Sequence, residues 1–126
     1  MINNDFLDLN IGDRRKVLTI VDIERLVIRG TPKIIFECLS EEGQVFKLDE
    51  ALVRNSKGSL VCKGFWASKD PNGCWNKDGA ISKVLSFYKK KTLRELLNMK
   101  IEAYPKPNDF LVLISCSFDE KLEIKW

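Results

Sequence analysis

The sequence predicts a small α+β protein that is mainly β: a five-stranded barrel with a helical insertion between its third and fourth strands. Three extended, alternating segments joined by short turns occupy residues 14–48. Over residues 81–88 the apolar period changes from two to about 3.6 residues, and two further extended segments follow residue 100. This order of elements is the basis of the predicted barrel.

Residues 14–29 predict a long first strand. The apolar side chains of its first half share one face by period-two spacing, and those of its second half shift in phase. A phase shift inside one extended run indicates a bulge or a strong bend. The first set is Val17, Thr19, Val21 and Ile23, and the second is Leu26 and Ile28.

Short turns separate the next two predicted strands. Residues 30–32 and 41–43 have the Gly, Pro and acidic residues typical of turns. Between and after them, the strands over 33–39 and 44–48 place alternating apolar residues on one face, and the chain is then expected to turn outward over 49–59 before a short strand at 60–66. Ile34, Phe36 and Cys38 share a face of the first of these strands, and Phe46 and Leu48 share a face of the second.

The second half of the chain begins with a polar loop over 68–79, rich in turn formers. Residues 81–88 then predict an amphipathic helix whose start lies near Asp78. A capping-box pattern from Thr92 to Glu95 predicts a second short helix that ends near Asn98. Strands over 100–104 and 109–116, joined by a turn at 105–108, complete the order.

The 126 residues predict a single domain, with a short N-terminal lead-in and a C-terminal tail from about residue 117. The chain has no apolar run that predicts a membrane span, and its N-terminus lacks the features of a signal peptide. We therefore expect no membrane partner and a cytoplasmic location, which would be the interior of the host cell for a viral protein.

The four cysteines, Cys38, Cys62, Cys74 and Cys116, form no C-x-x-C pair. Cys38 and Cys116 lie in apolar runs and are expected to be buried thiols. A Cys62–Cys74 disulfide remains an alternative, although disulfides are rare in the cytosol. The spacing does not predict a metal site.

The composition argues against an enzyme. The chain has no histidine, the commonest general base near neutral pH. It also lacks a Gly-rich phosphate loop, a nucleophile elbow and a D-x-D metal cluster. We expect no catalytic residues, no metal and no cofactor.

Positive charge is concentrated in residues 54–91, which carry nine basic and two acidic residues. The rest of the chain carries twelve basic and sixteen acidic residues, so the overall charge of +3 hides an asymmetry. Such a window attracts phosphates, and affinity from several phosphate contacts falls steeply with salt. The alternative is a solvated surface, including a favourable helix terminus at residues 89–91.

Three aromatic residues, Phe65, Trp66 and Trp75, lie in the same window. Large aromatic side chains usually pack into the core, and flat exposed rings stack on bases. Phe65 and Trp66 are adjacent in a predicted strand and must point opposite ways, so at most one is a core residue. Trp75, surrounded by turn residues, is the best stacking candidate.

Five strands with a helix between the third and fourth is the order of the OB-fold. The run from Leu93 to Tyr104, a Pro/Asn turn, and the apolar segment from Phe110 to Leu113 resemble the closing half of small OB-fold single-stranded DNA-binding proteins of phages and archaeal viruses. The resemblance covers residues 14–116 by element order and 81–114 by residue pattern, with Asn98 near the position where those proteins have glycine. It implies a viral protein with a role in DNA replication or recombination.

The resemblance further implies that ligands use the face of the second and third strands with the flanking loops. Its expected face residues are Lys33, Ile35, Glu37, Phe46 and Lys47. The tail loosely resembles the acidic, aromatic-ended tails of phage and bacterial single-strand binders through Asp119, Glu120, Glu123 and Trp126. The alternative for this tail is a final strand with Trp126 packed.

The leading hypothesis is a non-enzymatic protein that binds single-stranded DNA or RNA with little sequence preference. The alternative is a small viral protein-interaction module, such as an inhibitor of a host defence complex of the anti-CRISPR type, in which the same basic window docks on an acidic partner. A protein partner and a homodimer both remain open. The predicted nucleic-acid-binding residues are Lys47, Lys63, Phe65, Trp66, Lys69, Trp75, Lys77, Lys83, Lys89 and Lys90.

Overall fold

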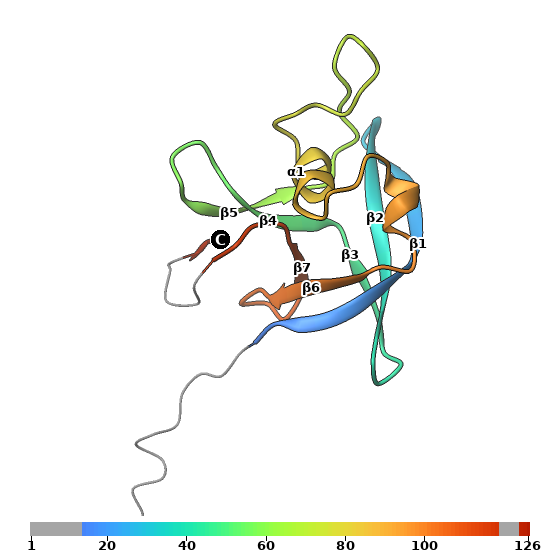
Figure 1. Ribbon diagram of the computed structural model, residues 1–126, viewed down its shortest axis with the longest axis vertical. Coiled ribbons are helices and arrows are strands. Elements are labelled where there is room, and N and C mark those ends of the chain that lie inside the picture. The colour runs from blue at the N-terminus through green and yellow to red at the C-terminus, as the bar shows by residue number, and fades with distance from the viewer. Residues whose placement is uncertain (1–13, 119–123) are drawn as a thin grey trace, which may run out of the picture.

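The computed structural model describes residues 14–118 and 124–126 (Figure 1). The predicted lead-in at 1–13 and the tail acids Asp119, Glu120 and Glu123 lie outside the described residues. Within the described part, one eight-stranded sheet, one α-helix and one 3-10 helix confirm a mainly β, α+β class. The elements are β1 (Lys16–Ile28), β2 (Thr31–Ser40), β3 (Val45–Leu48), β4 (Glu50–Arg54), β5 (Leu60–Gly64), α1 (Ala80–Phe87), η2 (Leu93–Leu96), β6 (Lys100–Pro105), β7 (Leu111–Ile114) and β8 (Ile124–Lys125).

The strands pair in the order β3-β2-β1-β6-β7-β4-β5-β8. β1 pairs antiparallel with β2 along most of its length and with β6 over its first four residues. β7 pairs antiparallel with β6 and parallel with β4. Only Asp49 separates β3 from β4 in the chain, so the series of paired strands that begins at β3 leads back to β4, the segment that directly follows it. Figure 1 shows the strands curling around a common centre.

The bend predicted in the first strand is present, but it lies nearer the N-terminus than expected. The β1–β2 register shifts between Ile20 and Asp22. The face that Val17, Thr19, Val21 and Ile23 were predicted to share is not the buried one, because Leu18 and Ile20 are buried whereas Val17 and Val21 are exposed. Both faces of this stretch carry apolar side chains, so alternation alone did not distinguish them.

The predicted faces of the second and third strands are confirmed: Ile34, Phe36, Cys38 and Leu48 are buried, and Phe46 is half-buried against the core. The expectation that residues 49–59 turn outward was wrong over β4. Its three central residues are all buried, between antiparallel β5 and parallel β7. A strand covered on both faces lacks polar alternation, which hid it in the sequence.

Helix α1 is confirmed, with Ile81, Val84 and Leu85 buried on its inner face. It follows β5 in the chain and begins at Gly79 without a side-chain cap. The predicted second helix is the short 3-10 helix η2, which ends at Leu96. No helix among the described residues is long and apolar enough to cross a bilayer.

The core lies inside the curled sheet, under α1. Phe36 of β2 and Phe65, just after β5, meet edge to face with ring centroids 4.9 Å apart, and both are fully buried. Trp75 packs against this core from the 68–79 loop. A smaller cluster of Leu52, Leu60 and Val112 fills the space on the other side of β4.

Candidate nucleic-acid interface

A groove of about 330 Å³ lies between the outer face of β2 and β3 and the turn that joins β6 to β7. We call it the Phe110 groove, after the most exposed aromatic ring among the described residues. Its lining combines an aliphatic floor, two lysines, two carboxylates, an amide and one aromatic ring. The lining residues are Ile35, Lys47, Asp49, Glu50, Lys106, Asn108, Phe110 and Leu111.

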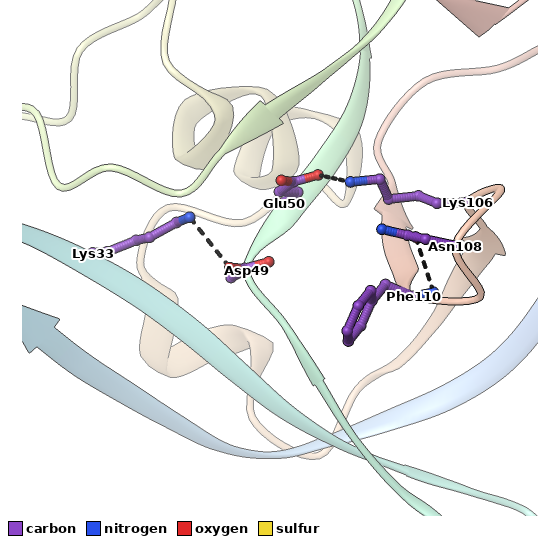
Figure 2. Close-up of polar contacts among 6 residues, drawn as sticks. All are labelled: Lys33, Asp49, Glu50, Lys106, Asn108 and Phe110. Atoms are coloured by element: carbon purple, nitrogen blue, oxygen red, sulfur yellow. Dashed lines mark hydrogen bonds and ion pairs between the residues drawn. The ribbon is translucent and has the colours of Figure 1, made fainter. Parts of the chain in front are cut away.

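The β6–β7 turn presents Phe110 because its backbone closes tightly. The N–H of Lys106 donates to the carbonyl of Phe110 at 2.7 Å, and the N–H of Asp109 donates to the carbonyl of Lys106 at 2.9 Å. The side-chain oxygen of Asn108 accepts from the Phe110 N–H at 3.3 Å (Figure 2). Phe110, 69% exposed, therefore sits at the rim of the groove on an ordered turn.

One ion pair joins two residues of the groove lining, and a second joins the lining to Lys33 at the border of the groove. Lys106 Nζ lies 2.9 Å from Glu50 Oε2, and Lys33 Nζ lies 3.2 Å from Asp49 Oδ2 (Figure 2). The hydrogen bond with Glu50 is the main cause that raises the pKa of Lys106. The positive charges near the groove are therefore partly neutralised by carboxylates of the same chain.

Trp66 lies beside this region and is 43% exposed. Lys33 Nζ stands 4.6 Å from its ring centroid, so the same ammonium meets a ring and the Asp49 carboxylate. The packing is close: a Cβ at Gly64 would lie 2.9 Å from Trp66 Nε1. Glycine at position 64 thus permits the position of the Trp66 ring.

An acidic cluster adjoins the groove on the β1 side. Carboxylate oxygens of Asp22, Glu24 and Glu37 lie within 4.8 Å of one another. Lys47 Nζ, which lines the groove, is 3.7 Å from Glu24 Oε2. Phosphates are repelled from this cluster, so an anionic ligand would follow the β3 and β6–β7 side of the groove.

The expected face residues divide among three places. Ile35 and Lys47 line the groove, and Lys33 lies at its border. Glu37 belongs to the acidic cluster. Phe46 packs against the core, and its ring also meets Lys16 Nζ at 5.5 Å from the centroid.

Of the ten predicted binding residues, Lys47 is the one that lines the Phe110 groove as the structure describes it. Phe65 is fully buried and cannot stack without leaving the core, and Trp75 is half-buried. Trp66 remains accessible. The other lysines, Lys63, Lys69, Lys77, Lys83, Lys89 and Lys90, lie on β5, the 68–79 loop and the α1 region, outside this groove.

Hydrogen bonds fix the positions of some of these lysines, and Lys63 is one example. Its Nζ donates to the carbonyl of Asp78 at 3.2 Å, joining β5 to the start of α1. Lys89 has a positive φ of 58° and ends the helix, and the N–H of Lys90 donates to the carbonyl of Leu85 at 2.8 Å. Lys63, Lys89 and Lys90 thus lie near the ends of α1, and none of them lines the Phe110 groove.

Sequence reasoning missed Lys106, Asn108 and Phe110 as site residues. The Pro/Asn turn was visible, but no local pattern indicated that it faces β3. The parallel pairing of β4 with β7 brings the two segments together, and that pairing joins residues about sixty positions apart. A long-range parallel pair leaves no signature in the local sequence.

All four cysteines are free thiols. Cys38 is buried as expected, and burial raises its pKa to about 12. Cys62 is half-buried with a pKa of about 11, also raised mainly by burial, and Cys74 is exposed. The Cys62–Cys74 disulfide alternative is therefore not formed.

The tail alternative is confirmed for its final strand, whereas Trp126 remains 49% exposed. β8 pairs parallel with β5, and the Trp126 ring stacks on Tyr104 with an interplanar angle of 22°.

Comparisons with protein-family models, curated proteins and solved structures returned no significant match. Any functional assignment therefore rests on the residues and their geometry.

Proposed function

We propose that this chain is a non-enzymatic protein that binds single-stranded nucleic acid in the Phe110 groove, with little sequence preference. The observation that carries the proposal is the position of Phe110. A ring that is 69% exposed stands on an ordered turn beside Lys47 and Lys106, over the outer face of β2 and β3. Exposed rings next to lysines supply stacking and phosphate attraction together.

The strand pairing supports an OB-type barrel as the framework. If β3 and β4 are counted as one strand bent at Asp49, the pairing runs 1-2-3-5-4-1, with β6 and β7 as the fourth and fifth strands. OB-folds bind oligonucleotides on the face of strands two and three, between the loops that join strands one to two and four to five. The Phe110 groove includes that strand face and the loop between the fourth and fifth strands.

Each group in the groove has a distinct chemical role in this proposal. Phe110 stacks on a base, which typically contributes about 1–3 kcal/mol. Lys47 and Lys106 approach phosphates, and the Asn108 amide can bond a base edge. The partner carboxylates Glu24 and Glu50 compete with phosphate for these lysines. Binding in the groove is therefore governed by stacking more than by charge.

Salt dependence separates the groove from the lysine-rich surface. Two phosphate contacts, by Lys47 and Lys106, give a slope of log K against log salt of about −1.4 for a single strand. Six contacts, by the lysines of β5, the 68–79 loop and the α1 region, give about −4. The proposal expects the shallower slope.

The experiment is a fluorescence-anisotropy titration of a labelled oligothymidylate of about 12 nucleotides, a length within OB-fold site sizes. Phe110→Ala should weaken binding by about 5- to 150-fold. The matched control is Phe87→Ala, which removes another exposed ring, on α1. Absence of binding by the unmodified chain at low salt would contradict the proposal.

A protein-interaction module, such as an inhibitor of a host defence complex, is the second candidate. The acidic cluster of Asp22, Glu24 and Glu37 favours it, because carboxylates beside the groove oppose a polyanion. A titration without response to oligonucleotide, together with a nuclease-resistant complex with a purified protein partner, would select this candidate. For both candidates the proposed location is the reducing cytoplasm.

A further inference from the structure

The outer edge of β1 over residues 24–28 lacks a partner strand among the described residues. β1 pairs with β6 only from Lys16 to Thr19, and further along it pairs with β2 alone. The other side of β2 is occupied here, because the Ile34 N–H donates to the Phe65 carbonyl at 2.8 Å and the Ala67 N–H to that of Pro32 at 2.9 Å. The sheet therefore ends at β1 in this region.

This edge is apolar on both of its faces. Leu26, Val27 and Ile28 are successive residues of a regular strand and are 45%, 59% and 39% exposed. Because side chains alternate in a strand, Leu26 and Ile28 lie on one face and Val27 on the other. Natural proteins usually protect a free edge with charges, bulges or a covering segment, and exposed apolar edges pair with further strands.

The backbone of the edge is able to continue the ladder. The Ile23 N–H donates to its neighbour's carboxylate, Asp22 Oδ1, at 2.9 Å, which indicates that this N–H points to the open side. Backbone groups of an antiparallel strand point alternately to its two sides. Those of Arg25 and Val27 therefore also point to the open side.

We propose that a second copy of this chain pairs antiparallel with this edge, around a two-fold axis at Leu26. A symmetric pair places each residue opposite its mirror position about the axis, and like charges directly opposite are destabilising. The register centred on Leu26 places Leu26 opposite itself, Arg25 opposite Val27, and Glu24 opposite Ile28.

The other registers centred on residues 23 to 27 each oppose like charges, and an axis at Ile28 would pair the strand with the turn at residues 29 and 30, where β1 has ended. An axis at Ile23 sets Asp22 against Glu24, and axes at Glu24 or Arg25 set each residue against itself. An axis at Val27 sets Arg25 against Arg29. Charge therefore selects the Leu26 register, in which the Arg25 stem also covers Val27.

This interface is small and does not include the Phe110 groove. It adds about four backbone hydrogen bonds between Arg25 and Val27 of the two copies. A contact of this size gives a weak dimer. The groove lining takes no residue from 24–28, so dimerisation and nucleic-acid binding are tested separately.

The first test is sedimentation of the full chain at concentrations up to about 0.1 mM, high enough to populate a weak dimer. The unmodified chain should be dimeric, and Leu26→Lys should halve the measured mass by setting two ammonium groups at the axis. The control Val45→Lys, at an exposed apolar position of β3, should remain dimeric, and circular dichroism should show both variants folded. A monomeric unmodified chain, or a dimer that Leu26→Lys leaves intact, overturns the proposal.

The second test measures the register. In a chain with Cys74→Ser, Leu26→Cys should form an intermolecular disulfide on mild oxidation, because opposite residues at a non-hydrogen-bonded pair lie about 4.5 Å apart. Val27→Cys, which would face Arg25, should crosslink at least tenfold more slowly. Equal rates of crosslinking for Leu26→Cys and Val27→Cys would overturn the proposed register. If the chain dimerises only after residues 1–13 are deleted, the partner of this edge is the chain's own N-terminal segment and the proposal is overturned.

Discussion

Lys106 reaches from the β6–β7 turn to Glu50 at the start of β4, with 2.9 Å between Nζ and Oε2. The pair ties the turn that carries Phe110 to the strand beneath it. Both side chains are mostly shielded, and the raised pKa of Lys106 follows mainly from this hydrogen bond. Glu50 thereby positions one of the two groove lysines and neutralises it.

Glu50→Gln should therefore tighten oligonucleotide binding. Removing an opposing carboxylate beside a phosphate-binding lysine is worth about 1 kcal/mol, or about fivefold in affinity at low salt. The slope of log K against log salt should stay at about −1.4, because Lys106 is already one of the two phosphate contacts in the unmodified chain. Anisotropy titrations at three salt concentrations measure both effects. Glu95→Gln, at an exposed acid of η2, is the control, and equal affinities for the two variants would argue against the groove.

Gly64→Ala should destabilise the fold by about 1–3 kcal/mol, because the new methyl group would lie 2.9 Å from Trp66 Nε1 and displace the ring. Urea unfolding measures the loss. The same change in a Trp66→Ala background should cost much less, since the obstructing ring is gone. Equal costs in the two backgrounds would show that Trp66 does not restrict position 64.

Tyr88→Phe should lower the unfolding free energy by about 1–2 kcal/mol. The Tyr88 hydroxyl donates to the Ile114 carbonyl at 3.0 Å and accepts from the Glu102 N–H at 3.3 Å, so it joins the end of α1 to β7 and β6. Thermal and urea unfolding give the difference. Tyr104→Phe is the control, because the Tyr104 hydroxyl makes no such bond among the described residues, and a similar loss there would contradict the assigned role.

Alkaline pH should destabilise the protein. Burial raises the pKa of Cys38 from 9.0 to about 12, so the folded chain keeps a proton that the unfolded chain releases. The stabilisation is therefore complete below pH 9 and is lost as the pH rises from 9 toward 12. Urea unfolding between pH 8 and 10.5 should show a decline approaching about 1.4 kcal/mol per pH unit for this thiol. Cys38→Val should make the decline shallower, with the half-buried Cys62 thiol contributing part of the remainder, and an unchanged slope would assign the decline to other groups.

The local pattern of apolar and polar residues predicted the elements that have one face on the core and the other face in water. β2 shows this clearly, because Ile34, Phe36 and Cys38 alternate with more exposed neighbours. α1 is a second example, with its buried residues at helical spacing. In both elements the burial period equals the backbone period, so the sequence contains enough information.

The same pattern did not predict segments whose two faces are both apolar. β4 is buried at Ala51, Leu52 and Val53, so it shows no alternation and was taken for an outward turn. In β1, apolar side chains occur on both faces around Val17 and Leu18, and only the closure of the sheet decides which face is buried. Such segments are specified by their neighbours in space.

The sequence by itself determined the mainly β class, the α1 helix, the turns at Gly43 and Gly58, and the separation of charge along the chain. These features depend on backbone periodicity, turn chemistry and composition, which are local. Only the tertiary structure decided that Phe65 is a core residue, that the lysines of 54–91 lie outside the Phe110 groove, and that Lys106 meets Glu50. Those relationships depend on the pairing of β4 with β7 and on the break between β3 and β4 at Asp49, which bring together residues too far apart for any local pattern to relate.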